Sequence, residues 1–536
     1  MTQAYDYIII GAGSAGCVVA NRLSANPDIR VLLLEAGGKD NNPWIHIPVG
    51  YFKTLHNPKT DWCYKTEEEP ELHNRKLDWP RGKTLGGSSS INGLLYVRGQ
   101  AEDYDGWAQA GNQGWSYDDI LPYFKRSQAM EGETNELQGR DGELAVSKIR
   151  AKSKISEAFI EAAVEMGVPR TDDYNGRDQE GVAYFDQTAK KGLRCSSAKA
   201  FLRPIRQRKN LEIITHAHTH HLLFDEADKK AVCGVAFDVK GKMQSASLRQ
   251  GGEVILSAGA IGSPQILECS GIGRGDILQK AAVEVRHDLA GVGEALQDHL
   301  QIRLVFETNV PTLNDMINSL TGKMRIGLEY MLARSGPMSL GASQVAIFAK
   351  SMAGLDTPDI QFHFQPLSAD KPGIVMHPFS GFTSSVCQLR PESRGTIHIT
   401  SPDAKTYPLI KANYLSATAD QLCAIRAVRF ARQMAEQPAL KPFIVREHTV
   451  IGDMATDEDH LEVARQFAQT IYHPTSTCRM GVDNQAVVDP ELRVHGIGNL
   501  RIADASIMPS IVSGNTNAPS MMIGEKASDM ILAARG

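Results

Sequence analysis

The chain of 536 residues has few of the features that mark disulfide-rich, zinc-binding or membrane-spanning proteins. Its eight cysteines are scattered, with no C-x-x-C pair and no regular spacing, which argues against a disulfide framework or a zinc knuckle. No uncharged run approaches the roughly 18 residues that a membrane span needs. The first basic residue is Arg22, so the apolar run from Tyr7 is not the core of a secretory signal. We therefore expect a cytoplasmic protein with reduced thiols; peripheral association with the cytoplasmic face of the membrane stays open.

The sequence also lacks a strong charge of one sign, internal repeats and low-complexity tracts. Its net charge of −5 creates no field that would attract a polyanion, so nucleic acid is not an expected partner. Hydrophobic residues make up 42% and charged residues 22%, a composition typical of a globular enzyme. The chain is too long to fold around one hydrophobic core of ordinary size, so we expect two domains or one elaborated domain.

The first strong signal is a glycine-rich turn near the N-terminus. A predicted strand at residues 7–10 leads into Gly11, Gly13 and Gly16, spaced G-x-G-x-x-G, and a second apolar run ends at Glu35. The first glycine permits a tight turn, the second lets backbone N–H groups approach a pyrophosphate, and the third lets helix and strand pack closely. Glu35 is placed to accept hydrogen bonds from ribose hydroxyls. The pattern predicts a bound adenine dinucleotide.

A glycine turn that binds nothing is the alternative interpretation, and the flanking strand, helix and distal acid make it the weaker one. The pattern does not separate NAD from FAD, because both contain a pyrophosphate and a ribose.

Two further segments carry candidate chemistry. Residues 79–93 contain paired glycines and a run of small hydroxyl residues, so main-chain donors can approach a flat ligand there, although a plain loop explains the segment equally well. Near the C-terminus, His473 precedes a proline and can exchange a proton near neutral pH. Asn517 lies in a polar turn that opens an apolar helix. Without context, a single histidine is more often a core residue.

The order of the remaining elements indicates interleaved domains. Residues 252–260 and 499–505 are predicted to be buried strands of the nucleotide domain. Residues 359–364 and 395–399 alternate in polarity and predict an antiparallel sheet.

Residues 315–334 predict an amphipathic helix, with apolar side chains at helical spacing. These side chains are Met316, Leu320, Met324, Leu328 and Met331. We expect this face to pack on the domain; a lid over a substrate entrance and a membrane-facing patch are the alternatives.

Six blocks, in order along the whole chain, resemble the glucose-methanol-choline (GMC) flavoprotein oxidoreductases. They are residues 11–16 with Glu35, 81–93, 259–273, 292–299, 473–474 and 517–519. Within that family, residues 86–92 and 514–519 look most similar to the bacterial choline dehydrogenase and alkanol dehydrogenase branch.

The resemblance implies a mixed α/β and α+β fold, in which a Rossmann-like FAD-binding domain is interleaved with a substrate domain built on an antiparallel sheet with flanking helices. The expected boundaries are 1–155, 200–305 and 466–536 for the FAD-binding domain, and 156–199 and 306–465 for the substrate-binding domain.

The resemblance also implies which residues hold FAD. The cofactor-binding residues are Gly11, Gly13, Ser14, Ala15 and Gly16 at the pyrophosphate, Glu35 and Ala36 at the adenosine, Arg81, Gly86, Gly87, Ser88, Asn92, Gly93 and Leu94 in the loop along the flavin, Ala258 near the adenine, Asp504 and Ala505 at the ribityl and pyrophosphate portion, and Asn517. Some family members bind FAD covalently through a histidine just before the motif asparagine. Ile91 stands at that position here, so non-covalent FAD is expected.

The implied reaction is oxidation of a primary or secondary alcohol to the aldehyde or ketone by hydride transfer to flavin N5. His473 is the expected base and Asn517 the expected group that orients the hydroxyl. The expected electron acceptor is a quinone-type molecule. An oxygen-using alcohol oxidase and a redox-inactive hydroxynitrile lyase of the same fold are the alternatives.

Other candidate residues have structural interpretations. His216, His218 and His220 share one face of a predicted strand and could hold a metal, but the family places a plain strand there and no metal is expected. Asp298 and His299 are expected to be structural near the flavin rather than proton carriers, and Cys478 is expected to be buried packing. The substrate is open: the Met and Leu content of residues 313–340 favours an apolar alcohol over choline, which would need an aromatic and acidic cage. The oligomeric state is also open.

Overall fold

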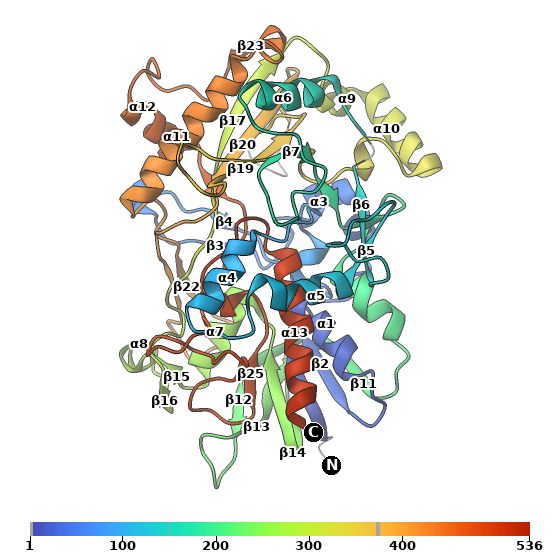
Figure 1. Cartoon of the computed structure of the whole chain (residues 1–536). Helices are drawn as coiled ribbons and strands as arrows, with labels where there is room; N and C mark the ends of the chain where they lie inside the picture. Colours follow the sequence, from blue (N-terminus) through green and yellow to red (C-terminus); the bar gives the residue numbers. More distant parts are fainter. Residues whose placement is uncertain (1–3, 150, 371–375, 536) are drawn as a thin grey trace.

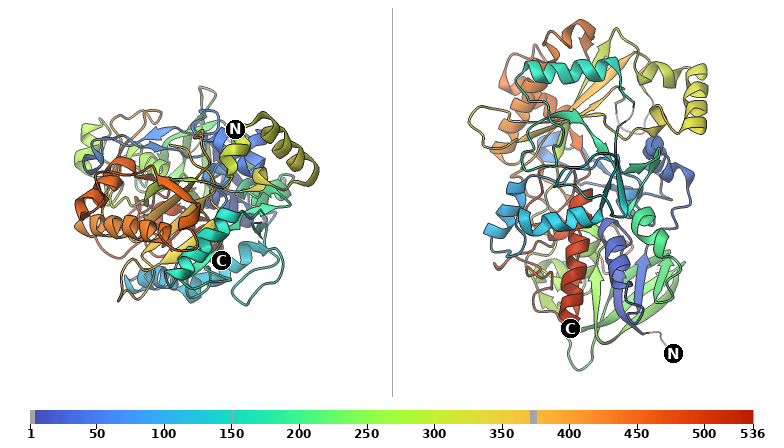
Figure 2. Two further views of the ribbon diagram at one scale, coloured as in Figure 1. Left: turned by 90° about the horizontal axis from the view of Figure 1, so that it is seen from above. Right: turned by 45° about the vertical axis from the view of Figure 1, so that its right-hand side comes forward.

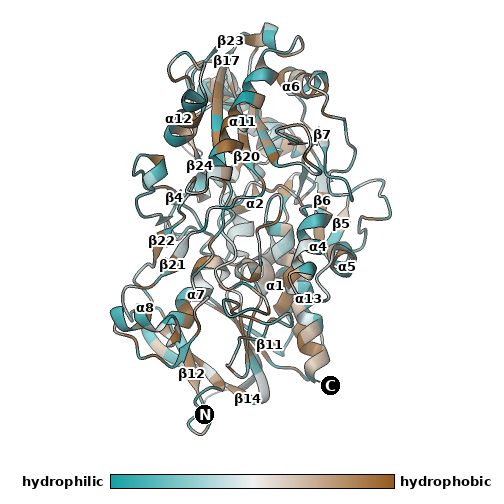
Figure 3. Cartoon of the chain, turned by 60° about the vertical axis from the view of Figure 1, so that its left-hand side comes forward, coloured by the Kyte–Doolittle hydropathy of each residue, from teal (hydrophilic) through white to brown (hydrophobic). Residues whose placement is uncertain are grey.

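The computed structural model describes residues 4–149, 151–370 and 376–535. Within these ranges the chain forms two seven-stranded sheets, one in the lower half of Figure 1 and one in the upper half. The N- and C-terminal ends of the chain lie near each other at the lower end of the molecule (Figures 1 and 2). Helices α8 (Gly275–Lys280) and α12 (Asp457–Phe467) carry many hydrophilic residues (Figure 3).

The first sheet has the order β11-β2-β1-β14-β13-β12, with β25 paired to β14. Its parallel part contains β1 (Ala4–Ile10), β2 (Val31–Glu35), β11 (Leu211–Thr215), β14 (Lys242–Leu256) and β25 (Leu500–Ile502). Strands β12 (Ala217–Phe224) and β13 (Val232–Val239) extend it in antiparallel fashion. Helix α1 (Ser14–Leu23) follows β1 directly, and its Cys17–Ala20 segment is completely buried. The sequence expectation for this Rossmann-like part is confirmed, including the two late strands.

The second sheet has the order β23-β17-β20-β19-β18-β7, with β24 paired to β17. The strands are β7 (Gly181–Tyr184), β17 (Leu300–Thr308), β18 (Val345–Ala349), β19 (Ile360–Gln365), β20 (Gly381–Gln388), β23 (Ile444–Glu447) and β24 (Gln469–Thr470). All of their pairings are antiparallel. Helices α6 (Lys154–Glu165), α11 (Thr418–Ala435) and α12 lie beside this sheet (Figure 1). The expected antiparallel sheet is therefore present.

Two details differ from the sequence expectation. Strand β21 (Thr396–His398) pairs with β22 (Leu409–Lys411) in a separate two-stranded sheet, although its polarity alternates like that of the main strands. The expected domain boundary between residues 305 and 306 falls inside strand β17. All of β17 belongs to the second sheet. The other expected boundaries remain a prediction.

The amphipathic segment is two helices, α9 (Leu313–Asn318) and α10 (Leu320–Ala333), because the Ser319 side chain caps a new helix by accepting from Gly322 N–H. The expected packing of its apolar face is wrong. Only Ile326 and Tyr330 of α10 are buried. Four of the five predicted apolar residues are exposed, Leu320 by 75%, Met324 by 68%, Leu328 by 54% and Met331 by 76%, and Met316 is half-buried. Both helices project from the side of the molecule (Figures 1 and 2). Helical spacing of apolar residues defines a face but not what covers it.

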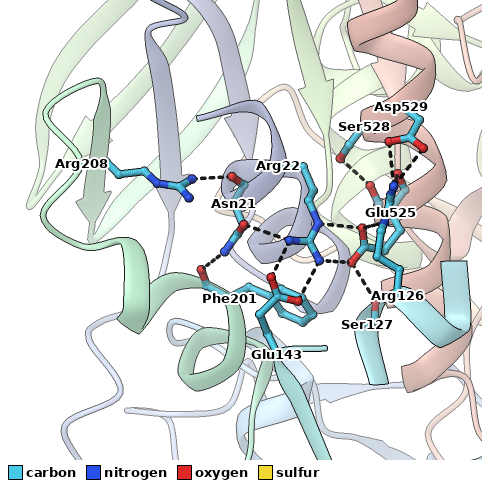
Figure 4. Close-up of polar contacts among 11 residues, drawn as sticks. Asn21, Arg22, Arg126, Ser127, Glu143, Phe201, Arg208, Glu525, Ser528 and Asp529 are labelled. Atoms are coloured by element: carbon cyan, nitrogen blue, oxygen red, sulfur yellow. Dashed lines mark hydrogen bonds and ion pairs between the residues drawn. The ribbon is translucent and has the colours of Figure 1, made fainter. Parts of the chain in front are cut away.

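The last helix, α13 (Asn517–Arg535), packs along α1 and is held there by a buried carboxylate (Figure 4). Glu525 is fully buried and accepts hydrogen bonds from Arg22 Nε at 2.8 Å and Arg126 Nε at 2.7 Å. The hydroxyl of Ser127 donates to it at 2.8 Å. Asp529 pairs with Arg126 at the exposed end of the same cluster. This cluster joins the first helix of the chain to the last.

Replacing Glu525 with alanine should lower the free energy of unfolding by about 3 kcal/mol, because two guanidinium groups lose their shared carboxylate in a largely buried site. The matched control is Asp529→Asn, which removes the half-exposed acid from the same cluster and should cost less than about 1 kcal/mol. Urea denaturation midpoints of both variants and the parent measure the difference. Equal midpoints for the two variants would contradict a special role for the buried carboxylate.

Candidate active site

One continuous cavity runs from the glycine turn after β1 to the inner face of the second sheet. Most of the residues expected at a cofactor line it: Gly11, Gly13, Ser14, Ala15, Glu35, Ala36, Arg81, Gly87, Ser88, Asn92, Gly93, Ala258, Asp504, Ala505 and Asn517, together with His473. Gly16, Gly86 and Leu94, which were also expected at the cofactor, do not line it. The structure thus brings together segments from the beginning, middle and end of the chain.

The glycine turn has the close packing that its spacing predicts. Gly11 has a φ of +100°, and a Cβ there would lie 2.4 Å from the Ser257 carbonyl oxygen. A Cβ at Gly16 would lie 2.0 Å from the Gly11 oxygen, so only glycine lets α1 approach β1 this closely. At Gly13 the nearest atom would be 3.8 Å away, which leaves the N-terminus of α1 open to the cavity. Unpaired N–H groups at such a helix end favour an anionic ligand such as a pyrophosphate.

Two buried carboxylates stand at this end of the cavity. Glu35 accepts from the backbone N–H groups of Ala12 at 3.0 Å and Gly37 at 2.7 Å, and burial raises its pKa to about 7. Asp504 accepts from Gly259 N–H at 2.9 Å and from the Ser263 hydroxyl at 2.6 Å. Each carboxylate is fixed by donors of the fold and keeps further acceptor capacity toward the cavity.

The second glycine loop lies directly on the first. Gly86 donates its N–H to the Ala12 carbonyl at 2.7 Å. Gly87 has a φ of +51°, and a Cβ there would lie 2.7 Å from Gly13 Cα, so the two loops pack backbone against backbone. The next part of the loop is fixed through Asn92, whose Oδ1 accepts from Arg194 at 2.6 Å. The residues present therefore fit an elongated dinucleotide with a flat ring at its far end.

His473 lies in the wall beyond that loop and is held at three points. Its backbone N–H donates to Asp298 Oδ1 at 2.6 Å. Its Nδ1 lies 3.0 Å from His299 Nδ1, and its Nε2 lies 3.1 Å from the side-chain nitrogen of Asn515. Asp298 is itself fixed by hydroxyl donors from Thr470 and Tyr414. The imidazole position is thus determined by neighbours on several segments.

The hydrogen-bond chain also fixes the tautomer of His473. His299 Nε2 lies 3.0 Å from the Leu389 carbonyl oxygen, which can only accept, so this nitrogen carries a proton. In a neutral His299, Nδ1 is then an acceptor, and His473 must donate from its own Nδ1. The His473 Nε2 lone pair is left facing Asn515 and the cavity.

Both imidazoles are neutral near pH 7. Burial lowers the pKa of His299 to about 4. Burial, with the neighbouring imidazoles of His299 and His363, holds the pKa of His473 well below its usual range. A neutral imidazole with its lone pair on Nε2 can accept a proton from a hydroxyl group placed in the cavity.

The asparagine that meets His473 differs from the expected one. Asn517 is the first residue of α13, and its Oδ1 accepts from the Ser14 hydroxyl at 2.8 Å, which places it beside the N-terminus of α1. Asn515, two residues earlier in the same turn, contacts His473 instead. Both asparagines occur in the turn 514–519, so the sequence indicated the correct turn. It did not indicate which of the two asparagines faces His473.

The other candidate residues are also located. His299 contacts His473 directly, closer to the chemistry than expected, and Cys478 is fully buried. His218 faces the Ala404 carbonyl and His220 pairs with Asp238. Among the described residues, no group of three or more His, Cys, Asp or Glu side chains is arranged to hold a metal ion. None of the helices in the described ranges has the length and apolar composition of a bilayer span.

Comparison with known proteins assigns the family. Two family models, both described as GMC oxidoreductase, match residues 5–301 and 391–524. The chain is 43% identical over 531 residues to an alcohol dehydrogenase [acceptor] of Pseudomonas putida, covering 98% of this chain and 96% of the relative. It is 41% identical over 537 residues to an oxygen-dependent choline dehydrogenase of Photobacterium profundum, covering 99% and 94%.

Solved structures give the same assignment. Pyridoxine 4-oxidase from Mesorbium loti superposes with a TM-score of 0.88 at 28% identity, covering 98% of each chain. Formate oxidase from Aspergillus oryzae RIB40 superposes with a TM-score of 0.91 at 27% identity, covering 100% of this chain and 99% of the other. The chain belongs to the GMC oxidoreductase family.

Proposed function

We propose that this protein is an FAD-dependent alcohol dehydrogenase that oxidises a primary or secondary alcohol and transfers the electrons to an acceptor other than NAD. The observation that carries the proposal is the neutral His473, whose Nε2 lone pair faces the cavity beside Asn515. The relatives at 41–43% identity, named alcohol dehydrogenase [acceptor] and choline dehydrogenase, support an alcohol as substrate.

FAD would lie along the cavity that the two glycine loops share. The N-terminus of α1 with Ser14 would hold the pyrophosphate, Glu35 the adenosine ribose, and Asn92 and Gly93 the flavin ring. Asp504 would meet the ribityl portion. Ile91 lines the cavity with an aliphatic side chain that cannot form a covalent bond to flavin, which supports non-covalent binding.

The protein groups would act on the hydroxyl of the substrate. Bound FAD supplies the acceptor for the hydride that leaves the carbinol carbon. His473 Nε2 accepts the hydroxyl proton, and the resulting imidazolium is stabilised because its Nδ1–H donates to His299. The Asn515 amide donates to the same oxygen and stabilises the negative charge that develops on it.

His473→Ala should slow flavin reduction by about 10²–10⁴-fold, the usual contribution of positioned proton transfer. Its FAD content should stay unchanged, because the cradle does not include this imidazole. Anaerobic stopped-flow mixing with an alcohol measures reduction, and acid precipitation, which should release all of the flavin, measures content. Unchanged reduction would remove His473 from the mechanism, and a flavin that stays oxidised with every alcohol would favour a redox-inactive lyase.

Two asparagine variants separate the roles of the C-terminal turn. Asn515→Ala should lower the flavin reduction rate by about 10²-fold, since one donor at the developing oxyanion is lost, while FAD stays bound. Asn517→Ala removes the partner of Ser14 and should weaken FAD binding, with reduction of the bound fraction little changed. The reverse pattern would restore the orienting role to Asn517.

We also propose that α10 places the protein on an anionic membrane surface, where a quinone-type acceptor would be available. Its exposed apolar face is bordered by Lys323, Arg325 and Arg334. The turn with exposed Lys190 and Lys191 packs against the same helix, since Tyr330 donates its hydroxyl to the Gly192 carbonyl at 2.8 Å. An apolar face with a cationic border is complementary to anionic headgroups over acyl chains.

Vesicles containing phosphatidylglycerol should bind the parent protein in a flotation assay, and Leu328→Glu should abolish binding while alcohol oxidation in solution stays unchanged. Val482→Glu, at a residue 67% exposed elsewhere on the surface, is the matched control and should bind like the parent. Binding should also weaken at high salt. Two results would contradict a specific role for α10. One is that both variants lose vesicle binding, and the other is that neither the parent nor the Val482→Glu control binds the vesicles.

A further inference from the structure

The far end of the cavity contains a buried cation without a matching anion. Arg303 lies on β17, is 4% exposed, and lines the cavity. The only hydrogen bond that its guanidinium makes within the described residues is a long one, 3.5 Å from Nη2 to the Ala369 carbonyl. Its Nε is buried without a partner. An arginine stays charged in a protein, so this charge is costly to bury unless something pairs with it.

No acidic side chain is available for that pairing. None of the ion pairs in the described ranges includes Arg303, and none of the residues outside those ranges is Asp or Glu. The nearest acid that influences it, Asp370, has an exposed carboxylate that pairs with His377 at 3.0 Å. The acids of the cavity wall, Glu35 and Asp504, stand at the cofactor end and are already held by backbone N–H groups.

The groups around Arg303 are also incompletely bonded. Arg303, Ser385 and His363 are direct cross-strand neighbours on β17, β20 and β19, so their side chains lie on one face of the sheet. The Ser385 hydroxyl is buried without a hydrogen-bond partner, and the His363 ring has no neighbour in this row to bond with and lies instead near the Asn515 amide. Buried polar groups in native proteins are nearly always paired, so the unpaired Arg303 guanidinium at the cavity wall, with the unpaired Ser385 hydroxyl beside it, indicates a place for a polar ligand.

The His363 end of this row lies beside the reacting groups, since its ring is near the Asn515 amide and its charge would act on His473. Gln361, two residues before His363 on the same strand face, donates to Asn515 at 3.3 Å. Arg303 lies two strands across from His363, which corresponds to about 10 Å. A molecule with its hydroxyl at His473 and Asn515 would therefore place a group several carbon atoms away near Arg303.

We propose that the substrate is a hydroxy acid, an alcohol whose carboxylate pairs with the Arg303 guanidinium while its hydroxyl group meets His473. The guanidinium fork matches a carboxylate in two parallel hydrogen bonds, and the hydroxyls of Tyr51 and Tyr472, which line the same cavity, add donors. A quaternary ammonium alcohol such as choline is disfavoured, because its positive charge would be buried beside that of Arg303. This inference rests on the proposed alcohol oxidation and names its substrate class.

The test compares a straight-chain alkanol, the ω-hydroxy acid of the same length, the matching hydroxyalkyl phosphate and choline on the FAD-loaded enzyme. The parent should prefer the hydroxy acid. Arg303→Gln should raise KM for the hydroxy acid roughly 10- to 150-fold, the effect of losing a charge-assisted hydrogen bond, while the kinetics with the alkanol change less than about 3-fold. Arg446→Gln, which removes an exposed arginine from the neighbouring strand β23, is the control and should behave like the parent.

A second measurement does not depend on turnover. Hexanoate, an unreactive carboxylate, should bind the parent in calorimetry and raise its thermal midpoint, and should do neither with Arg303→Gln. Equal loss of alkanol and hydroxy acid turnover in Arg303→Gln, or hexanoate binding that survives the substitution, would overturn the inference. Preference for the phosphate would replace the carboxylate by another oxyanion and overturn the hydroxy acid assignment. Hexanoate binding without any flavin reduction by alcohols would reject the proposed oxidation but not the anion site.

Discussion

The contact between the first and last helices of the chain determines where the reacting groups lie. Glu525 joins α13 to Arg22 of α1, and at the other end of the same helix pair Asn517 accepts from Ser14. Two contact points about eight residues apart on α13 fix both the height and the rotation of the helix. The turn just before α13 is fixed with it, so the Asn515 amide reaches His473. A surface ion pair would not hold this position as firmly, since exposed pairs contribute little free energy.

Burial then sets the protonation states that the chemistry needs. His473 and His299 are both removed from water, and desolvation disfavours their charged forms. The Leu389 carbonyl then determines which nitrogen of each ring carries the proton. His299 therefore helps to fix the position and tautomer of the His473 imidazole. The same low-polarity surroundings strengthen each hydrogen bond to a developing alkoxide, because water does not compete for it.

Sequence patterns predicted the parts of this structure that are determined locally. The β1 turn and α1 form one contiguous unit, in which glycine spacing follows from backbone contacts only a few residues apart. Strands β14 and β25 were predicted because uninterrupted apolar runs are typical of a buried parallel sheet. Other features depend on distant partners. Whether Asn515 or Asn517 faces the histidine depends on how α13 docks on α1, and no local pattern contains that information.

The exposed face of α10 shows the same limit. The spacing of Met324, Leu328 and Met331 is identical whether the face packs on a domain or is left open, so the sequence defined the helix but not its surroundings. Likewise, β21 alternates in polarity like a strand of the main sheet, yet its partner is β22 in a separate pair. Pairing between strands is decided by the topology of the whole chain, which short-range alternation does not encode.

If the substrate is a hydroxy acid, as proposed, the polarity of the cavity explains why similarity to choline dehydrogenases would not carry choline specificity with it. Identity near 41% extends over the whole chain and therefore reports mainly the shared fold and cofactor cradle. Specificity depends on a few side chains on the inner face of the second sheet. There this chain has Gln301 and Arg303, a neutral amide and a cation, and the positive charge of Arg303 would repel a quaternary ammonium group. The desolvation that keeps His473 neutral also makes the unpaired charge of Arg303 costly to bury. An anionic substrate would relieve that cost by pairing with Arg303. The same substrate would exclude water from His473.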